Sequence, residues 1–137
     1  MIAAARPQTR SDVRSDAHSM IMKGIPQAAI GHLVGSSAVL SADHIAAALG
    51  ISTRTLRRQE ASPQKLMAPE LGSRAWSFAQ TLAKTIEVFG ARHAAELWLV
   101  EPAMGLDGER PIDLLRTQQG AELVNEFLDR LAYGVYN

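Results

Sequence analysis

Residues 41–58 read SADHIAAALGISTRTLRR and contain the strongest local pattern in the chain. Two short helical patterns are separated by Gly50-Ile51-Ser52. Ser41 and Ser52 stand where helix N-caps are expected, and Gly50 stands where the first helix must end in a left-handed residue. In a helix-turn-helix, the first helix supports a second helix that enters the major groove of DNA. We therefore predict a helix-turn-helix, with an ordinary helical hairpin carrying a solvated arginine-rich face as the alternative.

The second helix of this pattern separates one apolar side chain from many polar ones. Leu56 is expected to face the core, together with Ile45 and Leu49 of the first helix. Thr53, Arg54 and Arg57 are then candidates for contacts to bases, and Ser52, Thr55 and Arg58 for contacts to phosphates. Because proteins of this kind usually bind as symmetric dimers, a homodimer and a palindromic operator are expected. The candidate DNA-binding residues are Ser52, Thr53, Arg54, Thr55, Arg57 and Arg58.

The composition of the 137 residues favours a folded intracellular domain. Apolar residues make up 47% of the chain, enough for the core of one domain or of two small domains that share it. The absence of cysteine excludes disulfides and thiolate zinc sites. The sequence contains no apolar run of membrane-spanning length and no secretory signal at its N-terminus, so we expect a cytoplasmic protein without a membrane partner.

The charge is distributed unevenly between the two halves of the chain. Residues 1–68 contain eight lysines and arginines against four carboxylates, whereas residues 69–137 contain six against ten. The basic half suits contacts to phosphates and the acidic half does not, which suggests that the halves face different partners. The alternative is that surface charge varies by a few units in any chain of this length.

Apolar residues recur at helical spacing through the rest of the chain, and no segment alternates with period two for long. We therefore predict an all-α fold in which a helix-turn-helix DNA-binding module precedes a small helical domain. The expected divisions begin with a flexible arm over residues 1–18, for which a short frayed helix is the alternative, and a helical segment with the helix-turn-helix over 19–68. A long connecting or dimerisation helix over 69–90 and a helical domain over 91–137 follow.

The sequence lacks the patterns expected of an enzyme. Its four histidines, His18, His32, His44 and His93, are far apart and form no metal-binding pair. No phosphate-binding or dinucleotide-binding glycine motif is present. The carboxylates of the second half recur at helical intervals, as expected of a solvated face. We therefore expect a binding protein that is not an enzyme and that holds no cofactor and no metal.

From Trp98 onward the C-terminal half of the chain reads WL, then Pro, LDG-x-x-PIDLL, T-x-x-G-x-x-x-V and L-x-R-L-x-YGVY. This pattern resembles the toxin-binding domain of Xre/MbcA/ParS-type antitoxins, the partners of RES-domain toxins. Residues 23–26 and 50–58 also look like the family, so the resemblance extends over residues 20–137. Asp107 and Gln59 depart from its pattern. The matching positions are Trp98, Leu99, Pro102, Leu106, Gly108, Pro111, Leu114, Leu115, Thr117, Gly120, Val124, Leu128, Arg130, Tyr133 and Gly134.

The resemblance implies a type II antitoxin that binds a RES-domain toxin and represses its own operon. RES toxins look like NAD-consuming enzymes of the ADP-ribosyltransferase fold, and the antitoxin would obstruct their active site without binding NAD itself. The aromatic tail YGVYN suits an interface, because tyrosine buries a large area and keeps a hydroxyl for hydrogen bonding. The expected toxin-binding residues are Leu106, Arg130, Tyr133, Gly134, Val135, Tyr136 and Asn137.

Other interpretations of the sequence stay open at this point. The tail residues could instead fold back, with Tyr133 in the core of its own domain. The chain could be a stand-alone dimeric helix-turn-helix regulator whose second domain only oligomerises or senses a ligand. An enzyme or enzyme subunit is a third possibility, disfavoured by the missing catalytic pattern.

Overall fold

The helix-turn-helix predicted from residues 41–58 is present as α3 (Ala42–Leu49) and α4 (Thr53–Glu60) in the computed structural model, which describes residues 10–134. The side-chain oxygen of Ser41 accepts the backbone N–H of His44 at 3.2 Å, and that of Ser52 accepts the backbone N–H of Thr55 at 3.1 Å. Gly50 ends α3 at φ 70°, a conformation that disfavours residues with a side chain. Ile45 and Leu56 are fully buried, so the two helices pack through the faces that the sequence predicts.

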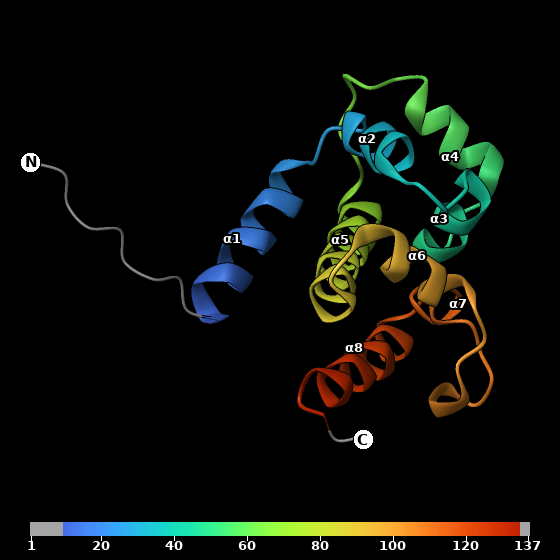
Figure 1. The fold of residues 1–137 in the computed structure, drawn as a ribbon. Helices are drawn as coiled ribbons and strands as arrows, with labels where there is room; N and C mark the ends of the chain where they lie inside the picture. Colours follow the sequence, from blue (N-terminus) through green and yellow to red (C-terminus); the bar gives the residue numbers. More distant parts are fainter. Residues whose placement is uncertain (1–9, 135–137) are drawn as a thin grey trace, which may run out of the picture.

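The long helix α5 (Pro69–Phe89) runs through the middle of the molecule and contacts α1, α3, α6 and α8 (Figure 1). Pro69 occupies the first turn, where backbone N–H groups have no partner within the helix, so its missing N–H costs no hydrogen bond. Gly90 ends the helix at φ 81°. Leu71, Phe78 and Leu82 form part of a buried stripe along one side. This helix is the common support for both halves of the chain.

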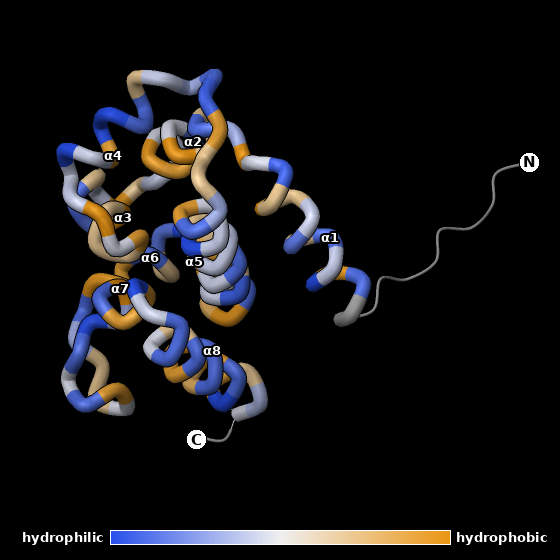
Figure 2. Tube along the Cα trace, turned by 180° about the vertical axis from the view of Figure 1, so that it is seen from behind, coloured by the Kyte–Doolittle hydropathy of each residue, from blue (hydrophilic) through white to orange (hydrophobic). Residues whose placement is uncertain are grey.

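The second half consists of α6 (Arg92–Val100), the 3₁₀ turn η1 (Met104–Leu106), α7 (Pro111–Leu114) and α8 (Gln118–Ala132). Thr117 is the N-cap of α8, and its side-chain oxygen accepts the backbone N–H of Gly120 at 3.0 Å. Apolar and polar residues share α8 (Figure 2), as expected of a helix that packs along one face. Val124 and Leu128 are fully buried against the core, whereas Leu123 is 53% exposed.

The N-terminal helices differ from the expected divisions. Helix α1 (Arg10–Lys23) begins inside the range predicted to be a flexible arm, so the expected boundary at residue 18 falls within a helix. It lies beside α5 (Figure 1), which it contacts, and Ala17 is buried. Helix α2 (Ala28–Ser36) begins two residues after Pro26. Pro26 forms an isolated β-bridge with Leu66, and this bridge holds the loop after α4 against the start of α2.

Residues 10–134 contain no β-strand, which confirms the all-α prediction. Within the same residues, none of the helices has both the length and the apolar character that crossing a bilayer requires.

Candidate functional site

The exposed face of α4 is a polar surface whose side chains are held by one another. The Ser52 hydroxyl donates to Thr55 Oγ1 at 2.9 Å, and the Thr53 hydroxyl donates to Asp43 of α3 at 2.6 Å. Fully buried Leu56 anchors the opposite side of the helix in the core. Figure 2 shows α4 as an almost entirely hydrophilic segment at the edge of the molecule. The fold therefore presents all six candidate DNA-binding residues on one short helix and its cap.

The three arginines of α4 are exposed but differ in their partners. Arg57 pairs with Glu60 at 3.1 Å, with 61% of the arginine side chain exposed. Arg58 donates to Thr55 Oγ1 at 3.4 Å. Arg54 forms no ion pair or hydrogen bond with any residue of the described range 10–134. The surface thus carries two arginines without a carboxylate partner in that range and one that pairs with the partly buried Glu60.

The end of α8 presents aromatic surface to solvent. Tyr133 is the C-cap of α8 and is 82% exposed, and Gly134 follows at φ 70°. Arg130 is exposed in the last turn of the helix. Val135, Tyr136 and Asn137 lie outside the described residues. Tyr133 is therefore not part of the core, contrary to the alternative in which it packs within its own domain.

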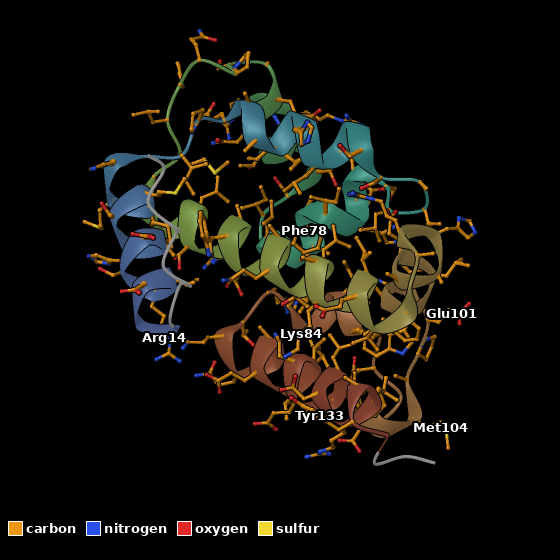
Figure 3. All side chains as sticks on the ribbon, turned by 60° about the vertical axis from the view of Figure 1, so that its left-hand side comes forward. Arg14, Phe78, Lys84, Glu101, Met104 and Tyr133 are labelled. Atoms are coloured by element: carbon orange, nitrogen blue, oxygen red, sulfur yellow. The ribbon has the colours of Figure 1, made fainter. Side chains whose placement is uncertain are left out.

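The η1 turn buries Leu106 and exposes Met104. Leu106, expected to contact a toxin, is 8% exposed and belongs to the core, so its side chain does not face a partner. Met104 is 96% exposed, and η1 contacts α8. Figure 3 shows Met104 and Tyr133 at the same edge of the molecule. A close contact between Gly105 and Phe127 allows η1 to lie this near to α8, because a side chain at Gly105 would clash with the ring.

Glu96 joins the second half of the chain to the helix-turn-helix. Its Oε1 accepts the backbone N–H groups of Ala38, Val39 and Leu40 at 3.0, 2.8 and 2.9 Å, and Oε2 accepts Arg92 Nε at 2.9 Å. Burial by itself would raise the pKa of the Glu96 carboxyl, but these donors outweigh burial and lower the pKa. The expectation that the carboxylates of this half form a solvated face is wrong for Glu96, which is fully buried.

Trp98 belongs to a stack of three aromatic rings. Its ring centroid lies 5.4 Å from that of Phe89 and 5.9 Å from that of Phe127. The stack joins α5, α6 and α8, so Trp98 has a packing role between these helices. Tyr133 is the aromatic residue that is most exposed within residues 10–134.

An apolar groove of about 590 Å³ lies between α1, α2 and α5. Met20, Ile25, Leu33 and Trp76 are among its lining residues, and Met20 is 51% exposed. His32 also lines the groove, while His44 accepts the backbone N–H of Ser41 and so has a structural role. No group of three or more potential metal ligands occurs within residues 10–134.

Two family models match the chain. An antitoxin Xre-like helix-turn-helix domain matches residues 16–80, and the antitoxin Xre/MbcA/ParS C-terminal toxin-binding domain matches residues 84–134. The chain belongs to the Xre/MbcA/ParS antitoxin family. The two matches meet within α5, so this helix contributes to both domains of the antitoxin fold.

Curated relatives and a solved structure agree with this membership. The chain is 31% identical to an antitoxin Xre of Yersinia enterocolitica over 66% of this chain and 61% of the relative. It is 34% identical to an antitoxin Xre of Pseudomonas putida over 61% of this chain and 52% of the relative. The match therefore spans between half and two thirds of these relatives.

The fold is also similar to that of a chain in the crystal structure of the M. tuberculosis MbcT–MbcA toxin–antitoxin complex. The TM-score is 0.54 at 23% identity, over 81% of this chain and 96% of that one. At this identity the likeness concerns the fold, and it confirms the all-helical architecture.

Proposed function

We propose that this chain is the antitoxin of a type II toxin–antitoxin system. Its C-terminal domain binds a RES-domain, NAD-consuming toxin and blocks the toxin's active site, while α4 binds operator DNA and represses the operon. The chain itself binds no NAD and catalyses no reaction in this proposal. Family membership supports the antitoxin proposal, and the observation on which the proposal depends is the exposure of Tyr133 at the end of α8.

The proposed toxin-contact surface consists of the end of α8 and the neighbouring η1 turn. Tyr133 provides an aromatic anchor with 82% of its surface available for burial, and Met104 adds a flexible apolar contact. Gly134 lets the chain turn away from the helix, and Arg130 offers a planar fork to a carboxylate of the partner. The proposal also includes Val135, Tyr136 and Asn137, which continue the chain beyond Gly134.

The proposed DNA-contact surface is the exposed face of α4. Arg54 and Arg57 are assigned to bases, and Arg58, Ser52 and Thr55 to phosphates. Arg57 must leave Glu60 to reach a base, which is a small loss because exposed ion pairs contribute only about 0–1 kcal/mol. Thr53 reaches a base only if its hydroxyl exchanges Asp43 for the DNA.

We further propose that the antitoxin acts as a homodimer and assembles with toxin into a hetero-oligomer. The apolar groove between α1, α2 and α5 is the surface assigned to the second copy, because Met20 and neighbouring apolar side chains are exposed there. A symmetric pair would place two copies of α4 on a palindromic operator.

Removal of residues 133–137 tests the proposal against the alternative of a stand-alone regulator. We expect the truncated chain to lose at least about 30-fold in affinity for a co-expressed RES-domain toxin, since hot-spot aromatic side chains contribute about 2 kcal/mol or more. Cell growth and pull-down report toxin binding, and DNA binding should be unchanged. Leu66→Ala is the matched control, because Leu66 is an exposed apolar residue in the loop before α5. Full neutralisation by the truncated chain would contradict the proposed surface.

A further inference from the structure

Two arginines from the region after α4 lie beside the turn of the helix-turn-helix. A Cβ atom placed on Gly50 would be 3.2 Å from Arg74 Nη1 and 3.8 Å from Arg116 Cβ. Arg74 belongs to α5, and Arg116 lies between α7 and α8 in the C-terminal domain. The turn that leads into α4 is therefore bordered by side chains that its own sequence motif does not contain.

The two arginines differ in how much of their charge is compensated. Arg74 pairs with Glu70 at 3.0 Å and directs Nη1 toward the carbonyl of Leu49 at 3.4 Å. Arg116 is exposed, and its side chain takes part in no ion pair or hydrogen bond with residues 10–134. Arg116 is thus the one of this pair whose charge is open to a partner, while Arg74 is held against the end of α3.

Both arginines line a polar cleft of about 780 Å³ between α1, α5 and the start of α8. Arg14 lines the same cleft from α1, and Figure 3 shows it toward one end of that helix. Glu70 is the only carboxylate among the lining residues of the described chain, and it pairs with Arg74. Ser73 and Thr117 add hydroxyl groups. A cleft with three guanidinium groups and one carboxylate fits a phosphodiester backbone.

We propose that Arg116, with Arg14 across the cleft, contacts operator phosphates next to the base pairs that α4 reads. This inference rests on the proposed DNA binding and adds a part of the C-terminal domain to the contact surface. Phosphate contacts fix the register of a protein on the duplex without reading its sequence. Arg116 and Arg14 therefore strengthen binding to every sequence alike, whereas Arg54 discriminates between sequences.

The position of Arg116 leaves the proposed toxin-contact surface free. Arg116 comes just before α8, and Tyr133 caps the other end of that 15-residue helix. At 1.5 Å per residue, the helix separates these two ends by roughly 22 Å. DNA at Arg116 and a protein at Tyr133 thus occupy opposite ends of the same helix.

Binding of the full-length protein to two duplexes tests the inference by fluorescence anisotropy over a range of NaCl concentrations. The probes are the DNA directly upstream of the protein's own reading frame and a shuffled duplex of equal length. We expect Arg116→Gln to weaken binding to both probes by the same factor and to reduce the salt slope by about 1 per protomer. Arg116→Lys should retain the slope. Arg54→Gln should instead reduce the preference for the upstream duplex.

Lys84→Gln is the matched control, because it also removes one positive charge but lies on α5 in an ion pair with Asp129. Its salt slope should equal that of the wild type. An unchanged slope in Arg116→Gln, or an equal reduction in Lys84→Gln, would overturn the inference. If Arg54→Gln still reduced the preference for the upstream duplex, the proposed function would stand. Failure of the wild-type protein to bind either duplex would overturn both.

Discussion

The exposed face of α4 and the end of α8 are both contact surfaces in our proposal, but they are built in opposite ways. On α4, polar side chains hold one another through the Ser52–Thr55, Thr53–Asp43 and Arg57–Glu60 contacts. At the other end, Tyr133 and Met104 expose large apolar surface. A polar surface can be organised in water before its partner arrives, whereas an apolar one gains free energy only when a partner covers it.

The two surfaces are nevertheless parts of one folded unit. Glu96 on α6 accepts three backbone N–H groups just before the helix-turn-helix, and α5 packs against both halves. The two surfaces therefore differ in their side chains, although the same folded unit holds both in place. Four measurements test this comparison.

The largest effect is expected for Glu96→Ala. This change leaves three backbone N–H groups and Arg92 without their acceptor, so we expect a loss of about 3–5 kcal/mol in the free energy of unfolding. Urea unfolding followed by circular dichroism measures it. Glu122→Ala, at an exposed position of α8, should change stability by less than about 0.5 kcal/mol. Equal effects of the two variants would show that Glu96 does not join the halves.

Gly120→Ala is expected to destabilise the protein by about 2 kcal/mol, since overpacking in a tight contact is unfavourable. A Cβ atom at Gly120 would clash with the carbonyl oxygen of Leu114, so α7 and α8 must move apart. The same substitution at Gly31 of α2 meets no atom within 4 Å. Gly31→Ala should therefore stabilise the helix by about 0.5–1 kcal/mol. Opposite shifts of the melting temperature check this pair, and a shift of the same sign in both variants would contradict it.

Acidification should weaken the contact between the two halves. The pKa of Glu96 is lowered in the folded state, so its contribution is complete above the ordinary glutamate pKa of about 4.3. That contribution is lost as the pH falls through the lower folded-state value. The free energy of unfolding, measured with urea between neutral and acidic pH, should fall more steeply for the wild type than for Glu96→Gln. Parallel pH profiles would assign the acid sensitivity to other carboxylates.

The smallest effect on stability is expected for Thr53→Val. It removes the hydrogen bond to Asp43, which is exposed and contributes about 0.5 kcal/mol. Affinity for the upstream duplex should change more than thermal stability does, because the hydroxyl belongs to the proposed DNA-contact surface. A loss of stability above about 2 kcal/mol would show that Thr53 mainly joins α3 to α4.

Features set by neighbours in the sequence were predictable, and features set by tertiary contacts were not. The caps Ser41 and Ser52 and the helix end at Gly50 follow from local backbone chemistry, and they are present. The burial of Leu106 could not be predicted, because it depends on how the segment after α6 folds back.

The roles of Met104, Glu96 and Arg116 also depend on distant parts of the chain. Glu96 accepts hydrogen bonds from residues more than 50 positions away, and Arg116 approaches Gly50 from the other domain. Helical spacing alone places Glu96 on a solvated face, and Arg116 lies between two helices, where spacing indicates nothing. The one local signal for Met104 was a methionine in a loop with two glycines, which is too common to indicate a contact surface.

The ring stack around Trp98 has a practical consequence for spectroscopy. The chain contains two tryptophans. The other one, Trp76, lines both the polar cleft and the apolar groove, and its indole nitrogen is buried. Each emitter therefore samples a different neighbourhood, one inside the C-terminal domain and one beside Arg74 and α1. Single-tryptophan variants would turn intrinsic fluorescence into two local reporters, without any attached dye.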